Sequence, residues 1–288
     1  MNDYTKGALI TAAGVVIISP DTLLIRLIDA DAWTQLFWRG ILAASAVLLG
    51  YAVVTRRGFP KHMQAMGLPG VVIALVFSLG TACFMYSAAN TLIANTLFIT
   101  ATSPVFAAIL SWLVLGERVS LRTLLTIVAS LCGIAIIAAG SVGEGPSQAS
   151  LAGDLSALGA AIALAVTFTI ARARKTASMV PAMGIAGYLS ALMALFMAPD
   201  LVIPEGDWLW MGLMGALVVP LGFALMTTGP RYLPAPDVSL LLLLEAILGP
   251  LIVWAVLAEY PGAYTLIGGG VVLGALFISN VTRRGARG

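Results

Sequence analysis

Charged side chains are scarce in this sequence. Asp, Glu, Lys and Arg make up 10% of its 288 residues, hydrophobic residues make up 60%, and the mean hydropathy is +1.02. A soluble globular domain carries about 25% charged residues, and too few remain here to cover the outside of a large soluble core. The composition therefore predicts a membrane protein and argues against a soluble one.

Residues suited to enzymatic chemistry are also few. His62 is the only histidine, and no His, Cys or Asp cluster has the spacing of a metal site. No glycine-rich phosphate loop follows a strand, so ATP-driven transport within this chain is not expected. Cys83 and Cys132 lie inside apolar segments, which indicates no disulfide framework. We predict neither an enzyme nor a cofactor, and the scattered basic residues, with a net charge of +2, indicate no nucleic-acid partner.

Long apolar segments are what the chain has instead. Charged residues, prolines and glycines divide it into ten of them. At about 1.5 Å per residue, the run 238–260 is long enough to cross a hydrocarbon core roughly 30 Å thick. We therefore predict an all-α, polytopic membrane protein with ten transmembrane helices. The predicted spans are residues 5–27, 33–54, 68–89, 92–115, 121–139, 153–173, 182–203, 208–228, 236–258 and 263–278.

The distribution of basic residues supports this number of spans. With the N-terminus in the cytoplasm, 13 of the 15 Lys and Arg lie on the cytoplasmic side, and the opposite loops hold acidic residues and no basic one. A wrong number of spans would scramble this asymmetry. The first span is too long for a signal peptide and is expected to stay in the protein. We predict a multi-pass protein of the inner (plasma) membrane with both termini cytoplasmic.

The second half of the chain repeats the pattern of the first. A shift of 142 positions superposes Trp112 on Trp254 and Glu117 on Glu259, and the match continues into the following apolar segment. A repeat of about half the chain inside apolar segments indicates a duplicated membrane protein.

The duplication predicts two repeats within one integrated transmembrane unit, residues 1–145 and residues 146–288. Each repeat holds five spans, and because five is odd, the second repeat enters the membrane inverted relative to the first. Inverted repeats commonly place a substrate site near the middle of the bilayer, between the repeats. We expect a central apolar cavity formed by spans 1, 3, 4, 6, 8 and 9.

Short motifs in corresponding places of the two repeats carry a family resemblance. The fourth span contains Pro104 and ends in Leu-Gly-Glu-Arg at residues 115–118, and in the second repeat Glu245 is followed 14 positions on by Glu259. With ten spans in inverted repeats, these features resemble the EamA branch of the drug/metabolite transporter superfamily over essentially the whole chain. Members of this family are mostly exporters of small metabolites, including amino acids, and some carry drugs or sugar phosphates.

The resemblance implies a secondary transporter that exports small amphipathic metabolites, amino acids first among them, by alternating access. One alternative is a carrier of drugs or organic cations, with or without proton coupling, and another is a non-transporting scaffold or sensor. The expected partners are a small-molecule substrate and the lipid bilayer. Glycines at Gly133 in the fifth span and at residues 268–270 in the tenth indicate faces for close helix packing or for a homodimer.

Glu245 is a carboxylic acid near the middle of the ninth span. It lies about eight residues, hence roughly 12 Å, from the cytoplasmic end of that span, and no basic residue is an obvious partner at that depth. Ionisable groups inside a membrane usually pair or line a wet cavity. The functional interpretation is a proton-coupling site or a site for a substrate ammonium group; the alternative is a protonated or hydrogen-bonded structural residue.

Asp21 and Arg39 form the next candidate for the site. Each lies about six residues, roughly 9 Å, inside the outer end of its span, and the two spans are neighbours in the chain. We predict an ion pair, which serves either as a structural staple or as part of the site. Arg26 lies close enough to the outer surface to snorkel, and we interpret it as an interfacial anchor.

The fourth span carries a polar stripe, formed by Thr96, Thr100 and Ser103 at positions i, i+4 and i+7. These hydroxyls either line the central cavity or bond to backbone and neighbouring helices. The remaining candidates for contact with a substrate are Ser78, Tyr86 and Trp38. Prolines inside spans free backbone groups and permit bends, which makes them candidate hinges for alternating access. The candidate hinges are Pro20, Pro104, Pro220 and Pro250.

Overall fold

The computed structural model describes residues 3–115, 121–142, 150–174, 177–228 and 235–285. All regular elements in these ranges are helices, and no strand occurs among them. Seven helical segments are long and apolar enough to cross a membrane, and three further apolar helices, at residues 124–140, 244–257 and 263–278, are shorter. The predicted all-α, multi-pass membrane architecture is therefore confirmed for the described ranges, whereas the number of ten crossings stays a prediction.

The first half of the chain forms the helices α1 to α7. They are α1 (Asp3–Ile18), α2 (Asp21–Leu27), α3 (Ala32–Thr55), the 3-10 helix η1 (Arg56–Gly58), α4 (Phe59–Asn90), α5 (Ile93–Thr100), α6 (Ser103–Leu115) and α7 (Leu121–Val142). The Gly-Glu-Arg that follows Leu115 in the family motif lies outside the described residues.

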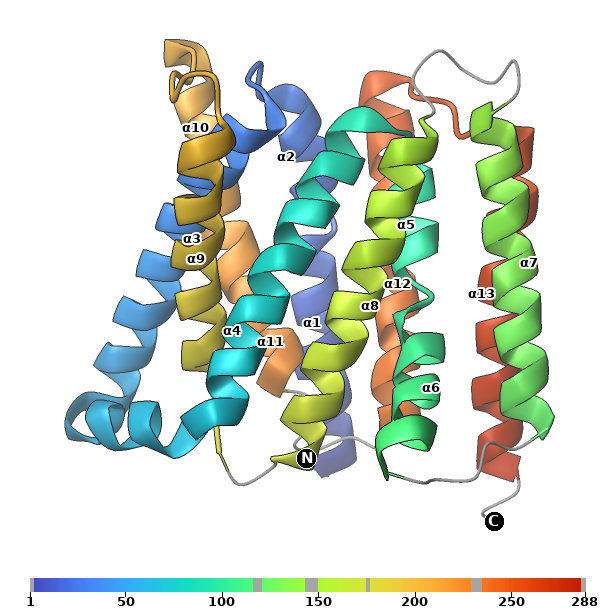
Figure 1. The fold of residues 1–288 in the computed structure, drawn as a ribbon, viewed down its shortest axis with the longest axis horizontal. Helices are drawn as coiled ribbons and strands as arrows, with labels where there is room; N and C mark the ends of the chain where they lie inside the picture. Colours follow the sequence, from blue (N-terminus) through green and yellow to red (C-terminus); the bar gives the residue numbers. More distant parts are fainter. Residues whose placement is uncertain (1–2, 116–120, 143–149, 175–176, 229–234, 286–288) are drawn as a thin grey trace.

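The second half forms the helices α8 to α13. They are α8 (Leu151–Ala173), α9 (Val180–Met197), the 3-10 helix η2 (Glu205–Asp207), α10 (Trp208–Gly212), the π-helix η3 (Leu213–Val218), α11 (Val219–Thr228), α12 (Ala235–Leu257) and α13 (Ala263–Gly285). The long helices run side by side, with the start of α1 and the end of α13 at the same end of the molecule (Figure 1).

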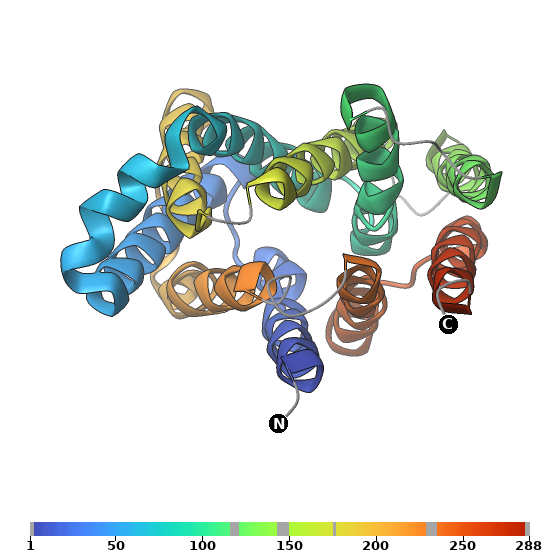
Figure 2. The same cartoon turned by 90° about the horizontal axis from the view of Figure 1, so that it is seen from below.

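The two halves of the chain interlock instead of forming separate bundles. Helix α1 packs on α11 and α4 packs on α8, so the first span contacts the eighth and the third contacts the sixth. Helix α3 packs on α9, and α7 packs on α13. In Figure 2, α1, α11, α12 and α13 form one layer, and α4, α8, α6 and α7 form the layer opposite. If the two halves are exchanged, the contact of α1 with α11 corresponds to that of α8 with α4, and the contacts of α3 with α9 and of α7 with α13 each correspond to themselves. A two-fold relation between the halves would require this correspondence.

Glycines permit the closest helix crossings between the halves. A methyl group added at Gly40 would lie 2.5 Å from the carbonyl oxygen of Gly187, where α3 crosses α9. A methyl group at Gly133 would lie 2.7 Å from the carbonyl oxygen of Gly268, where α7 crosses α13. Both crossings therefore depend on the missing side chain. Gly270 has open space beside it, and the predicted homodimer stays a prediction.

Prolines lie beside breaks in two of the predicted spans and beside a π-helical stretch in a third. The first span is divided into α1 and α2 at Ser19 and Pro20, and the fourth into α5 and α6, with Pro104 as the second residue of α6. In the eighth span the helix is continuous, and Pro220, the second residue of α11, lies two residues after the π-helix η3. Pro250 lies inside α12, which continues through it. Proline lacks an N–H group and clashes with the preceding turn, which accounts for the breaks.

The connection before the third span is helical where the sequence suggested a loop. Helix α4 consists of two helices joined at Gly67, whose φ of +50° places it in the left-handed region. Glycine adopts this conformation without a Cβ clash, and Pro69 follows two residues later. The bend sets the segment 59–66 at an angle to the membrane-crossing part of α4, at the end of the molecule where α1 begins (Figure 1).

Candidate functional site

A cavity lies between the two layers of helices. The space open to the centres of water molecules measures about 150 Å³, roughly ten times what one buried water needs. The sequence predicted walls from spans 1, 3, 4, 6, 8 and 9, and the structure adds α3 and α9, the second and seventh. The predicted site residues that line the cavity are Asp21, Arg39, Thr100, Ser103 and Glu245, with the prolines Pro104 and Pro220.

Asp21 and Arg39 form the predicted ion pair at one end of the cavity. Their Oδ2 and Nη2 atoms are 2.8 Å apart, and each side chain is 5% exposed. Asp21 is the first residue of α2, directly after the break at Pro20. Arg39 also donates to the sulfur of Met85 at 3.0 Å, and its guanidinium carbon lies 5.9 Å from the ring centroid of Phe84. The Asp21 Oδ1 atom is buried and has no partner among the described residues.

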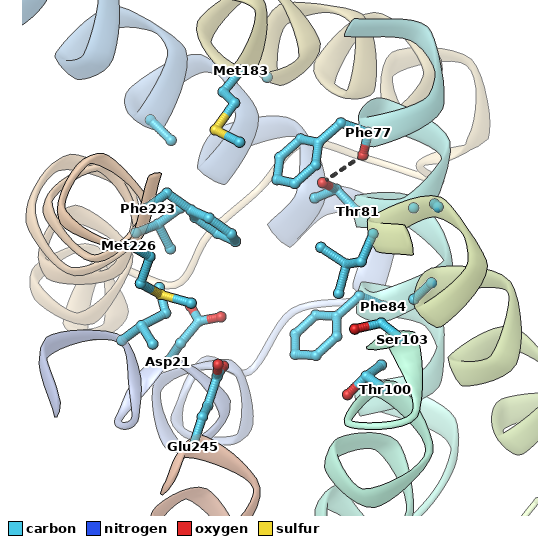
Figure 3. Close-up of a pocket in the computed structure, with 18 of the residues that line it drawn as sticks. Asp21, Phe77, Thr81, Phe84, Thr100, Ser103, Met183, Phe223, Met226 and Glu245 are labelled. Atoms are coloured by element: carbon cyan, nitrogen blue, oxygen red, sulfur yellow. Dashed lines mark hydrogen bonds between the residues drawn. The ribbon is translucent and has the colours of Figure 1, made fainter. Parts of the chain in front are cut away.

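Glu245 faces this pair from α12. Its carboxyl group points into the cavity toward Asp21 (Figure 3). The charged groups whose fields act on Glu245 are Asp21 and Arg39, and it has no hydrogen-bond or ion-pair partner among the residues that the structure describes. Two carboxyl groups and one guanidinium, all ionised, would give the cavity one net negative charge. Such a cavity favours a cation, because charges act strongly on one another where water is scarce.

Aromatic and methionine side chains form most of the remaining walls. Phe77 of α4 and Phe223 of α11 meet edge to face across the cavity, with ring centroids 5.3 Å apart. Phe84 lies nearer Asp21, and Met183 and Met226 approach from α9 and α11 (Figure 3). The walls can therefore hold the apolar part of an amphipathic solute.

The sequence predicted an apolar cavity but did not identify these wall residues. Phe77, Thr81 and Phe84 lie at i, i+4 and i+7 on α4 and all face the cavity. Their spacing was a usable signal. It was hidden because an aromatic residue in a membrane helix can face lipid equally well.

The polar stripe of the fourth span is only partly in the cavity. Thr100 and Ser103 line it, although the Thr100 hydroxyl donates to the carbonyl oxygen of Thr96 at 2.8 Å. Thr96 is not among the lining residues: its hydroxyl lies 2.7 Å from that of Ser87 and joins α5 to α4. In this structure Thr96 therefore connects two helices and does not line the cavity, and its predicted contact with a substrate stays a prediction.

Three further predicted residues also lie outside the cavity lining. The Ser78 hydroxyl donates to the carbonyl oxygen of Leu75 at 2.8 Å, and Trp38 Nε1 donates to that of Leu201 at 2.9 Å. The Tyr86 ring packs against that of Trp33 at 6.5 Å. Ser78 and Trp38 are each one position from a lining residue, and Tyr86 is two positions from one. At about 100° of turn per residue, such offsets rotate these side chains away from the cavity.

The hinge candidates divide in the same way. Pro104, next to a helix break, and Pro220, after the π-helix η3, line the cavity, whereas Pro20 and Pro250 do not line it. Pro20 nevertheless lies beside Asp21 and ends α1, so it positions the ion pair. The hinge function of all four stays a prediction.

The cavity extends toward the end of the molecule where α1 begins. Its lining includes Met183, near the start of α9, and Met226 and Phe168, near the ends of α11 and α8. These three helix ends lie at the same end of the molecule as the start of α1 (Figure 1). At the opposite end, the lining stops at the Asp21–Arg39 pair.

Beyond that pair, polar contacts tie the two halves together. Arg26 Nε lies 3.1 Å from Glu259 Oε2, and Glu259 Oε1 accepts from the backbone N–H of Ile93 at 2.8 Å. The interpretation of Arg26 as a snorkelling anchor is therefore wrong, since it pairs with a residue of the other half. Sequence depth alone gave no sign of this distant partner.

A second group of side chains adjoins the Arg26–Glu259 contact. Asp154 Oδ1 accepts from the Thr91 hydroxyl at 2.8 Å and from Asn95 Nδ2 at 3.0 Å, and the Thr265 hydroxyl donates to Asn95 Oδ1 at 2.6 Å. The network joins α5 and the segment before it to α8 and α13. Arg26 binds the carbonyl oxygen of the same Thr91 at 2.6 Å, so the two groups are continuous.

Comparisons with known proteins agree with this architecture. The sequence pattern of the EamA-like transporter family matches residues 5–139 and, a second time, residues 151–281. The uncharacterized transporter YetK of Bacillus subtilis (strain 168) is 25% identical, over 96% of this chain and 88% of its own. An uncharacterized transporter of Archaeoglobus fulgidus is 23% identical, over 96% of each chain. A protein of known crystal structure shares the fold with a TM-score of 0.68, at 16% identity, over 96% of this chain and 98% of its own.

Proposed function

The chain belongs to the EamA-like transporter family, and on that premise we propose that it is a secondary carrier that exports small amphipathic metabolites, amino acids first among them. The observation that carries the proposal is the arrangement of Glu245 opposite the Asp21–Arg39 pair in an otherwise apolar cavity. A membrane protein keeps ionisable groups at such depth where they serve a pathway or a site.

An amino acid fits this arrangement at each of its groups. The ammonium group pairs with the carboxylate of Glu245, which has no ion-pair partner among the described residues. Arg39 has five N–H donors, and its bonds to Asp21 and Met85 do not use all of them. The carboxylate of the substrate accepts hydrogen bonds from the remaining donors. The side chain packs against Phe77 and the other apolar wall residues. Polar groups thus fix the orientation and the apolar walls supply most of the contact area.

Transport proceeds by alternating access between two inverted repeats, residues 1–145 and 146–288, in the inner membrane with both termini cytoplasmic. The exchangeable contacts of the two halves support the inverted relation. The cavity extends toward the end where α1 begins, so this conformation corresponds to the inward-facing state. The break before Pro104 and the π-helix before Pro220 border the cavity and are the places where the helices bend.

A carrier of organic cations is the second candidate. Arg39 is already paired with Asp21 at 2.8 Å, and the cavity carries a net negative charge when its three charged groups are ionised. A cation with an aromatic or alkyl body then binds through Glu245 and the apolar walls alone. This substrate class differs from the first in having no use for the guanidinium of Arg39.

Counterflow in proteoliposomes tests both proposals. Purified protein is reconstituted with unlabelled solute inside, and labelled amino acids and organic cations are presented outside, without a pH gradient. We expect uptake of at least one amino acid, and its loss in Glu245→Gln. Glu205→Gln is the matched control, because Glu205 is exposed at the end of the molecule away from the cavity opening.

The possible outcomes separate the candidates. Exchange of organic cations alone supports the second candidate and overturns the first. If neither class exchanges while the protein remains folded, both proposals fail, and a scaffold or sensor remains. Full activity of Glu245→Gln would remove Glu245 from the site.

A further inference from the structure

We propose that the break between α1 and α2 forms a binding site for a sodium ion at a corner beside the cavity, where Asp21, Thr22 and Glu245 supply side-chain oxygen atoms. The site would be built from oxygen atoms alone. This proposal deepens the proposed function. Only the role of the ion as a coupling ion in transport rests on that function. The binding itself can be measured on the purified protein without any substrate.

The first observation is a row of backbone carbonyl groups that the break sets free. The last backbone hydrogen bond of α1 runs from Ser19 N to Val15 O, and the first of α2 from Leu24 N to Pro20 O. Pro20 has no N–H group to offer the carbonyl of Val16. In this described stretch, the carbonyl groups of residues 16–19 therefore have no backbone partner. At membrane depth such groups need a partner from elsewhere, because lipid offers none.

The second observation is a pair of side-chain oxygens left over at the same place. Asp21 Oδ1 and Thr22 Oγ1 are buried and have no hydrogen-bond partner among the described residues. Threonine in a membrane helix usually bonds to the carbonyl four residues earlier, as Thr11 does to Gly7 at 2.9 Å. Thr22 does not. A buried polar atom without a partner calls for an explanation, and an ion or ordered water supplies one.

The third observation is the position of Glu245 relative to this corner. Helix α12 passes close to Thr22, since a methyl group built on Gly249 would lie 3.6 Å from Thr22 Oγ1. Gly249 is one helical turn from Glu245, whose carboxyl group points toward Asp21 (Figure 3). The carboxyl groups of Asp21 and Glu245 thus approach the corner from two helices.

Charge selects the ligand. Two facing carboxylates repel, and Arg39 neutralises Asp21 from its Oδ2 side only, at 2.8 Å. A monovalent cation between Asp21 Oδ1 and Glu245 completes an alternating row of charges, from guanidinium to carboxylate to cation to carboxylate. A divalent cation would leave an excess positive charge in a cavity with little water. In several other transporter folds with inverted repeats, backbone carbonyl groups at unwound helix segments coordinate sodium ions.

Thermal unfolding of the purified protein tests the site. The protein is heated in a series of sodium chloride concentrations, with choline chloride keeping the ionic strength constant and potassium chloride as a second series. A ligand that binds only the folded state raises the unfolding temperature with its concentration. We expect a rise that saturates with sodium and that potassium and choline do not reproduce.

Two variants connect the response to the corner. Thr22→Val removes one oxygen and little volume, and we expect it to raise the sodium concentration for half of the effect by at least about tenfold. Thr167→Val is the matched control: Thr167 is a buried threonine whose hydroxyl also lacks a partner, but it lies on α8. We expect its response to equal that of the unaltered protein.

Several results would overturn the proposal. A cooperative unfolding transition without any sodium-specific rise would do so, and so would an unchanged response in Thr22→Val. A rise produced by acid in choline chloride, with none from sodium, would assign the corner to a proton instead. Because no substrate is present, this failure is distinct from that of the counterflow experiment, and either proposal can stand alone.

Discussion

Arg26 and Glu259 lie 233 positions apart in the chain and form an ion pair that joins the two halves, with Nε and Oε2 separated by 3.1 Å. Their side chains are 19% and 10% exposed, so water screens the pair only partly. Both partners also bind backbone groups near the start of α5: Arg26 binds the carbonyl oxygen of Thr91, and Glu259 accepts from the N–H group of Ile93. The pair lies at the end of the molecule opposite the cavity opening, and a carrier must separate this contact to open its cavity there.

Weakening this contact should make the cavity accessible from the side predicted to be external. In a background of Cys83→Ala and Cys132→Ala, a cysteine at Thr81 reports access to the cavity wall. We expect Glu259→Gln to increase its labelling by a membrane-impermeant maleimide added outside severalfold, because a charged hydrogen bond contributes about 1.5–3 kcal/mol. Glu205→Gln serves as control. Equal labelling in both variants would contradict a gating function of the pair.

Charge made the centre of the site predictable from the sequence. Asp21, Arg39 and Glu245 stood out because ionisable residues at membrane depth are rare, and all three line the cavity. Phe77 and Phe223 carried no comparable signal, since an aromatic side chain is equally at home against lipid. The apolar character of the cavity was predicted, whereas the residues that form its walls became known only from the packing of the helices.

Distant partners mark the limit of the sequence analysis. Depth along a span was readable for Arg26 and Thr96, but the helices beside them were not. Each has a partner on another element, Glu259 and Ser87 respectively, which the sequence did not reveal. The same holds for the fold: apolar runs predicted the helices and prolines predicted where they become irregular, whereas neither pattern indicated that the irregularity before Pro220 takes the form of the π-helix η3.

Substitutions of Asp21 and Arg39 should have strongly non-additive effects on the free energy of unfolding. Removal of one partner leaves an uncompensated charge in a buried place, which typically costs about 3–5 kcal/mol. We expect Asp21→Asn and Arg39→Gln each to lower the free energy of unfolding by roughly this amount, and the double variant to lower it by much less than the sum. Denaturant unfolding in detergent measures all three. Additive losses would mean that the 2.8 Å contact contributes no coupling.

The crossing of α3 and α9 should not tolerate a methyl group. In Gly40→Ala the new Cβ would lie 2.5 Å from the carbonyl oxygen of Gly187, so the helices must move apart. We expect a loss of about 1–3 kcal/mol in the free energy of unfolding, as for other overpacked sites. Gly212→Ala is the control, because nothing lies within 4 Å of a methyl group there. Equal stability of the two variants would refute the close crossing.

The edge-to-face contact of Phe77 and Phe223 should set the preference for the apolar part of the substrate. An aromatic contact is worth about 0.5–1.5 kcal/mol beyond its buried area, which corresponds to roughly a 2- to 10-fold change in affinity. Phe223→Ala should therefore raise the half-saturating concentration of an aromatic substrate in counterflow by at least that factor, and that of a small aliphatic one by less. Phe196→Ala removes a phenylalanine that is 79% exposed on the outside of α9 and should change neither value. Equal losses for both substrates in Phe223→Ala would show that the ring maintains the cavity and does not select its content.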